Sequence, residues 1–339
     1  MSIRRPPWDT TALAVMVVTA LAVVACGTSE PTPTPTPSPT PTAAPPPTAL
    51  SAGEMEYFVQ VQAAQKLTTS NFENFGAIFG GAWPLRSLLI DALLEAGVGT
   101  AFTGTLEALA GLSPPERFRA EHERMVDVTR ELVRLDGEAA QAVEDDDLVR
   151  FVLVNGELGQ VSFSVLLGFS ATFCQNAFAA DDVRAPLCGP AGPLPGGEYG
   201  ASLHEALRRF EPGLSSAMGV FGFPLSLRPD ELATVLATQG STFREQLREV
   251  RAQVESLTPP EELRADHDRL VAYYDRFIDG VSDLIAPEAG DAETARGDFF
   301  LGFQAQFCET GQSFSSPQFE ALVGPHFAAT ADICDEAPF

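Results

Sequence analysis

The chain has 339 residues, of which 45% are hydrophobic and 20% are charged. Acidic residues outnumber basic residues by 46 to 21, so the formal net charge is −25 at pH 7. A body this acidic is repelled by nucleic acid and by anionic lipid headgroups, and we therefore discount both as partners.

The first residues have the composition of an export signal. Arg4 and Arg5 provide a short positive start, and residues 11–25 form an uncharged, largely apolar run. This run is shorter than the roughly 20 residues that a membrane-spanning helix needs. A positive start followed by a short apolar segment is typical of a secretory signal, so residues 1–25 are predicted to be removed from the mature chain.

The end of that segment carries a more specific pattern, formed by Val23, Val24, Ala25 and Cys26. It resembles the bacterial lipobox, which has a branched apolar residue, then a small residue directly before a cysteine. The resemblance implies that Cys26 receives a diacylglycerol on its sulfur and becomes the new N-terminus. The mature chain is then expected to be lipid-anchored on the extracytoplasmic face of the cell membrane or envelope. The membrane is its expected partner, and the N-terminal lipid makes that contact.

Residues 26–50 are predicted to form a linker between the lipid and the folded body. Residues 31–50 alternate proline with threonine and serine and then become rich in proline and alanine. Proline has no N–H and fixes φ, so this segment favours extended polyproline II rather than helix. At about 3.1 Å per residue it reaches on the order of 60 Å, and we interpret it as a disordered stalk.

The remaining sequence contains an internal repeat. Residues 112–126 match residues 257–271 at nine of fifteen positions, and residues 167–174 match residues 301–308 at six of eight. The matches occur in the same order, and their period is the size of a domain rather than of a solenoid unit. The sequence therefore predicts a first helical repeat over residues 51–192 and a second over residues 193–339.

Each repeat is expected to hold four helices. Capping boxes, which mark helix starts, are predicted at Ser51 with Glu54, at Ser113 with Glu116 and at Thr258 with Glu261. Apolar residues then recur at helical spacing along residues 118–132 and 263–284. Val165, Phe169 and Phe173, at steps of four, suggest that a fourth helix continues through residues 165–173. Gly97, Gly99 and Gly104, by contrast, weaken the second helix of the first repeat.

No sustained alternation of Val, Ile and Thr occurs, so no sheet is expected. Helices joined by short connections favour an all-α fold of two tandem, internally duplicated units, each resembling a four-helix bundle.

Besides Cys26 there are four cysteines, an even number in a chain predicted to be exported. Three pairings are possible, and the repeat favours Cys174 with Cys188 and Cys308 with Cys334. Free or differently paired thiols are the alternative.

Two of the four histidines, His122 and His267, are equivalent in the repeat and fall on apolar helix faces. Either they are structural histidines that are hydrogen-bonded inside the body, which we favour, or they are ligands of a divalent metal or another cofactor. His204 and His326 belong to no recognisable motif. The spacing around His122 and His267 fits no di-iron pattern, and the sequence holds no serine-hydrolase, P-loop or haem-attachment motif.

The favoured functional prediction is a non-enzymatic extracytoplasmic module that binds an envelope protein or a small ligand, with no cofactor. The alternative is a metal- or cofactor-binding helical bundle that uses His122 and His267. An enzyme of unfamiliar design is the least favoured reading.

Overall fold

A computed structural model describes residues 49–79, 86–179, 184–188, 194–221, 227–285 and 314–327, and every regular element in these ranges is helical. The all-α class is therefore confirmed. The α-helices are α1 (Ala52–Phe79), α2 (Arg86–Glu95), α3 (Thr103–Ala110), α4 (Arg119–Glu144), α5 (Leu148–Ser164), α6 (Ala171–Ala177), α7 (Gly197–Phe221), α8 (Pro229–Glu255), α9 (Arg264–Ile285) and α11 (Pro317–Phe327). Short 3-10 turns are η2 (Glu116–Phe118), η3 (Val165–Gly168), η4 (Ala185–Cys188) and η5 (Glu261–Leu263).

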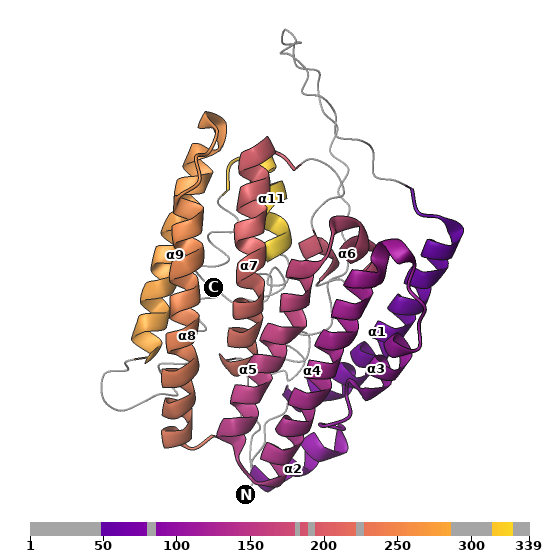
Figure 1. The fold of residues 1–339 in the computed structure, drawn as a ribbon. Coiled ribbons are helices and arrows are strands. Elements are labelled where there is room, and N and C mark those ends of the chain that lie inside the picture. Colours follow the sequence, from indigo (N-terminus) through magenta and orange to yellow (C-terminus); the bar gives the residue numbers. More distant parts are fainter. Residues whose placement is uncertain are drawn as a thin grey trace, which may run out of the picture.

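The long helices lie side by side along one axis (Figure 1). Across the body the order is α9, α8, α7, α5 and α4, with α3 and α1 beyond α4, and each helix contacts the next in this order. The short helices α6 and α11 lie toward one end of the body, and α2 lies at the other (Figure 1).

The two sequence repeats meet along α5 and α7, which have the most extensive contact of any pair among the described helices. Gly159 of α5 allows this approach, because a Cβ atom placed there would lie 2.9 Å from the carbonyl oxygen of Ser215 on α7. One apolar core runs through both repeats, from Leu89 on α2 to Val323 on α11. A second core belongs to the first repeat alone and is centred on Phe118 and Phe173.

An ionic contact joins the repeats at the α2 end of the body. The guanidinium of Arg86 donates to both carboxylate oxygens of Glu231 on α8, at 2.9 and 3.0 Å, and also to Asp146 in the turn between α4 and α5. Burial acts to raise the pKa of Glu231, but hydrogen bonds from the Arg228 backbone and from Arg86 outweigh it and lower that pKa. Glu231 is therefore held as a charged partner between the two repeats.

The apolar stripes predicted along residues 118–132 and 263–284 are confirmed as far as residue 281, and the side chain at position 284 lies outside the described residues. On η2 and α4 the buried members are Phe118, His122, Met125, Thr129 and Leu132. On η5 and α9 they are Leu263, His267, Leu270, Tyr274, Phe277 and Val281. The alternating steps of three and four residues place each set on one face of its helix, and that face packs into the body.

The predicted starts of these two helices are wrong by two residues. Pro115 and Pro260 are the N-terminal flanking residues, and neither the Ser113 nor the Thr258 side chain caps the helix. A residue before proline is disfavoured in the helical region, so Pro114 and Pro259 cannot be the first helical residues when proline follows them. By contrast, the box at Ser51 and Glu54 is confirmed, with backbone N–H groups reaching Glu54 at 2.7 Å and Ser51 at 3.3 Å.

The fourth helix of the first repeat is also interrupted, contrary to the expected continuous run. The chain is helical to Ser164, passes through η3, and becomes extended at Phe169 with ψ 142°. Ser170 then caps a new helix, α6, by accepting a hydrogen bond from the backbone N–H of Phe173 at 3.3 Å. The three apolar residues still reach the core, because Val165, Phe169 and Phe173 are all buried.

The glycines near residue 100 break the second helix of the first repeat into α2 and α3, as the sequence indicated. Gly97 and Gly99 take positive φ angles of 85° and 95°. The buried carboxylate of Asp136 on α4 accepts the backbone N–H of Ala101 at 2.8 Å and holds this turn against α4. Burial raises the pKa of Asp136, and hydrogen bonds from the Gly99 and Ala101 backbone partly oppose that rise.

We expect Gly99→Ala to lower the free energy of unfolding by about 2–3 kcal/mol. A Cβ atom there would lie 2.8 Å from the Cβ of Ala140, and the positive φ would itself be strained. Chemical denaturation measures the change. Gly137→Ala is the matched control, because that helical position is open and alanine there should stabilise by up to about 1 kcal/mol. Equal effects of the two variants would contradict the prediction.

Candidate functional site

His122 lies on α4 with its ring against α1. Its Nδ1 is 2.9 Å from the hydroxyl oxygen of Tyr57, and the two rings meet edge to face with centroids 5.8 Å apart. Both side chains are buried. Burial lowers the pKa of His122, with Glu123 acting in the opposite direction, so the imidazole is held neutral and the tyrosine hydroxyl supplies its hydrogen-bond partner.

The second repeat contains the same pair. The hydroxyl of Tyr199 on α7 lies 3.0 Å from Nδ1 of His267 on α9, again with ring centroids 5.8 Å apart. Burial lowers the pKa of His267, and Asp268 acts against it. The interplanar angles of the two pairs are 63° and 65°, so the duplication seen in the sequence extends to side-chain geometry.

Each predicted site histidine is thus placed beside its own tyrosine, on different helices of different repeats. Among the described residues, no group of three or more His, Cys, Asp or Glu side chains is arranged to hold a metal ion. The tyrosine partners were not predicted, because Tyr57 and Tyr199 lie far from the histidines along the chain. Tyr273, beside Tyr274 on α9, is also buried.

We expect Tyr57→Phe and Tyr199→Phe each to lower the free energy of unfolding by about 1 kcal/mol, because each removes one buried hydrogen bond and leaves an imidazole nitrogen unpaired. The equivalent geometry predicts similar losses, and their sum in the double variant, since the pairs lie in separate repeats. Urea denaturation tests this. A loss at one site only would show that the two pairs are not energetically equivalent.

The two remaining histidines form a cluster that the sequence did not predict. His326 on α11 has its Nδ1 2.9 Å from the Glu211 carboxylate, and its Nε2 lies 3.1 Å from Nδ1 of His204. Glu211 and His204 both belong to α7. The three residues are 7–8% exposed, so this is a buried polar chain inside the second repeat.

The hydrogen bonds in this chain determine which ring nitrogens of His326 and His204 carry a proton. A carboxylate oxygen only accepts, so Nδ1 of His326 carries a proton. In the neutral ring Nε2 of His326 is then an acceptor, and Nδ1 of His204 must donate to it. Nε2 of His204 is left as a bare acceptor, and it is buried without a hydrogen-bond partner among the described residues. Burial lowers the pKa of His204 to about 4, and His326 and Arg208 add to this effect while Glu205 opposes it.

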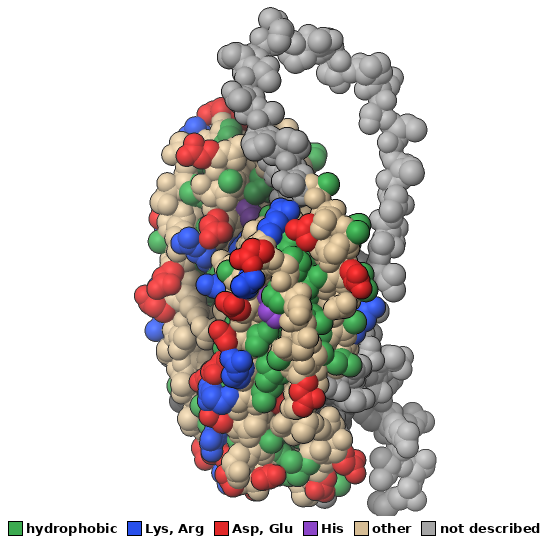
Figure 2. Space-filling model, turned by 45° about the vertical axis from the view of Figure 1, so that its right-hand side comes forward, with side chains coloured by type: hydrophobic (Ala, Val, Ile, Leu, Met, Phe, Trp, Pro, Cys, Tyr) green, Lys and Arg blue, Asp and Glu red, His purple; other side chains and the backbone are tan. Residues whose placement is uncertain are grey.

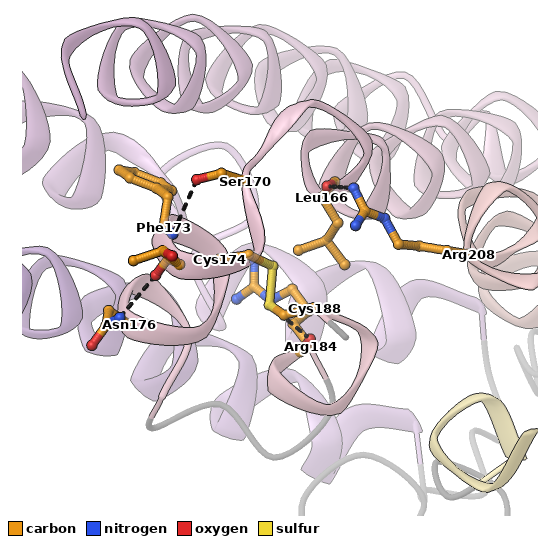
Figure 3. Close-up of a disulfide and its surroundings, with 9 residues drawn as sticks. Leu166, Ser170, Phe173, Cys174, Asn176, Arg184, Cys188 and Arg208 are labelled. Carbon is orange, nitrogen blue, oxygen red and sulfur yellow. Dashed lines mark hydrogen bonds between the residues drawn. A yellow bond between two sulfur atoms is a disulfide. The ribbon is translucent and has the colours of Figure 1, made fainter. Parts of the chain in front are cut away.

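Arg208 extends the cluster toward the first repeat. Its guanidinium crosses from α7 to donate to the backbone carbonyl of Leu166 in η3 (Figure 3). Within the described part of the chain its Nε has no hydrogen-bond partner, and burial lowers its pKa. The arginine therefore contributes a positive charge close to His204, and the nearby Glu205 carboxylate partly offsets that charge.

Cys174 of α6 and Cys188 of η4 form a disulfide with a sequence separation of 14 residues (Figure 3). This is the pairing that the repeat indicated for the first half. Both sulfurs are buried, and the bond ties η4 to α6. Cys26, Cys308 and Cys334 lie outside the described residues.

The sequence contains one signal for the polar cluster on α7. His204, Arg208 and Glu211 are separated by four and three residues, which places three polar groups on one helix face. The buried residues Leu203, Leu207 and Phe210 surround them. The part played by His326 had no such signal, because it depends on the packing of α11.

Together these features define an all-α protein with a duplicated helical body, one buried Tyr–His pair in each repeat and a Glu–His–His chain in the second. No family model, no curated protein sequence and no solved structure shows significant similarity to the chain.

Proposed function

We propose that the chain is a lipid-anchored extracytoplasmic lipoprotein whose helical body is a non-enzymatic binding or interaction module. The observation that carries the proposal is the order of segments: a lipobox-like site at Cys26, a Pro/Thr stalk, and then the capped start of α1 at Ser51. Acyl chains on the cysteine bury many methylenes, at roughly 0.8 kcal/mol each, and suffice as an anchor without a basic patch.

The outer face of α1 supports an interaction role for the body. Met55 and Val59 lie one turn apart and are 52% and 64% exposed, on the first helix after the stalk. Neighbouring large apolar side chains at the surface favour contact with a partner. On the face drawn in Figure 2, acidic and basic side chains are interspersed with hydrophobic ones.

Helix α5 and the adjoining turn η3 have the composition of a membrane span. Residues Leu148–Gly168, which form α5 and η3, are long and apolar enough to cross a membrane. Their packing between α4 and α7 instead supports the role of a core helix. Membrane attachment is therefore assigned to the N-terminal lipid in this proposal.

The anchor is tested by expressing the full chain in a bacterial host and comparing it with Cys26→Ser and the matched control Thr28→Ser. The parent and the control should sediment with the membrane fraction and carry an acyl mass on the N-terminal peptide. Cys26→Ser should lose both. Equal membrane retention of all three chains, without an acyl mass, would overturn the proposed anchoring.

The binding role is tested by screening the body for envelope metabolites and peptides that raise its melting temperature. For a partner contacting α1, the shift should be lost in Val59→Asp and kept in Gln60→Glu, an exposed neighbour on the same helix. Hydrolysis or another turnover of a screened compound would contradict the non-enzymatic assignment.

The second candidate function is a metal- or cofactor-binding bundle that uses His122 and His267. The observation that favours it is the tyrosine hydroxyl on each Nδ1, because a partner at one ring nitrogen orients the other toward a metal. Metal analysis of the purified protein tests it. A stoichiometric divalent metal that is lost in His122→Ala and His267→Ala would support this function over the first.

A further inference from the structure

We propose that Glu211, His326 and His204 form a proton-operated latch, which holds the C-terminal part of α11 against α7 near neutral pH and releases it in acid. The proposal stands on the order of donors and acceptors in the chain and on the separate attachment of the other end of α11. It does not depend on the N-terminal anchor.

Both hydrogen bonds that link Glu211, His326 and His204 form when the two imidazoles are neutral. His326 donates from Nδ1 to Glu211 and accepts at Nε2 from Nδ1 of His204. These contacts join two residues of α7 to the last turn of α11. Protein interiors satisfy nearly all buried polar groups, so this arrangement specifies where His326 must sit.

One added proton is also accommodated. If His326 becomes an imidazolium, it donates to Glu211 from Nδ1 and to His204 from Nε2. His204 then accepts at Nδ1 and carries its proton on Nε2. Both hydrogen bonds survive, and the bond to Glu211 becomes charge-assisted, which strengthens it.

A second proton cannot be accommodated in the same geometry. His204 would then carry a proton on Nδ1 facing the proton on Nε2 of His326, across the 3.1 Å that separates the two nitrogens. Two donors and two positive charges would oppose each other in a buried site. Moving His326 away from α7 relieves the conflict and exposes both rings to water.

The charged and titratable groups around His204 and His326 favour release. On α7, Arg208 adds positive charge and Glu205 opposes it, while Glu211 is already engaged by His326. On α9, Tyr274 lies near Glu211 as a neutral phenol, its pKa raised by burial and by that carboxylate. Among the described residues no further carboxylate is bonded to either imidazole to compensate a second charge.

The other end of α11 is attached independently. The buried carboxylate of Asp266 on α9 accepts the backbone N–H groups of Ser315 and Ser316 at 2.9 and 2.8 Å. Ser316 in turn caps α11 by accepting the N–H of Phe319 at 3.3 Å. Release at His326 therefore pivots α11 about Ser315 and Ser316, and it uncovers the buried side chains of Leu322 and Val323.

Hydrogen–deuterium exchange of the full chain between pH 6.5 and pH 4 tests the latch, with rates converted to protection factors. If the pKa of His204 is 6.5 in the open state and about 4 in the closed state, protection of α11 should fall on the order of 100-fold between pH 6.5 and pH 4. Amides of α4 should stay protected, which distinguishes opening of α11 from global unfolding. Proton uptake by the open state drives the change, so protection falls as pH falls.

His204→Gln should abolish most of the loss of α11 protection in acid. The glutamine amide can donate a hydrogen bond to neutral His326 and accept one from protonated His326. His122→Gln is the matched control, a buried histidine that faces no second imidazole, and its α11 should still open in acid. The latch is overturned if α11 and α4 lose protection together in the parent chain, or if His204→Gln opens as readily as the parent.

A direct measurement covers the case in which His204→Gln does not fold. Nitrogen chemical shifts of the histidines in the parent chain report the tautomer and the proton uptake of His204. The latch requires that His204 carry a single ring proton while α11 is protected, on Nδ1 when His326 is neutral and on Nε2 when His326 is charged. It also requires that His204 take up its second proton over the same pH range as the loss of α11 protection. Uptake while α11 stays protected would refute it.

Discussion

Asp266→Ala is expected to lower the free energy of unfolding by about 3–4 kcal/mol, the largest effect of any single substitution considered. The carboxylate is 1% exposed and accepts from two backbone N–H groups, from the Ser315 hydroxyl at 3.0 Å and from Arg269 at 2.8 Å. Alanine leaves the N–H groups of Ser315 and Ser316 without their acceptor, and an unsatisfied buried donor costs about 1–3 kcal/mol. Urea denaturation measures the loss.

Asp268→Ala is the matched control for this prediction, because Asp268 is an exposed carboxylate two positions away on the same helix. A surface substitution of this kind should change stability by no more than about 0.5 kcal/mol. Exchange protection in α11 should fall in the Asp266 variant and not in the control. Similar losses in the two variants would mean that the carboxylate does not hold α11.

Removal of the disulfide between Cys174 and Cys188 is expected to cost about 3 kcal/mol. The bond closes a loop whose ends are 14 residues apart, and in the chain-entropy model such a crosslink destabilises the unfolded ensemble by about that amount. The double substitution Cys174→Ala with Cys188→Ala removes the bond without placing a hydroxyl in the apolar surroundings of Phe173. Denaturant midpoints, with and without a reducing agent, measure the change.

Reduction provides the internal check on that experiment. The parent chain should lose stability when reduced, and the double variant should show at most the part of the loss that comes from other cysteines. If the double variant is as stable as the oxidised parent, the crosslink contributes nothing to stability. Peptide mapping under non-reducing conditions confirms which sulfurs are joined before the comparison is made.

Local patterns in the sequence were sufficient where the determining contacts are local. The apolar stripes of α4 and α9, the capping box at Ser51 and the glycine break near residue 99 all depend on residues a few positions apart. The pairing of Cys174 with Cys188 followed from the repeat. The predicted caps at Ser113 and Thr258 are wrong for a local reason too, because the second proline of each Pro-Pro pair disfavours the helical region for the residue before it.

The sequence by itself determined that this protein is helical and duplicated, because helix periodicity and repeated segments are written in the order of residues. Only the tertiary structure decided which polar groups meet. Tyr57 reaches His122, and His326 reaches both His204 and Glu211, across 65 residues in the first case and more than a hundred in the second. Partners this far apart are set by how helices dock, and the same pattern of apolar faces is compatible with more than one docking.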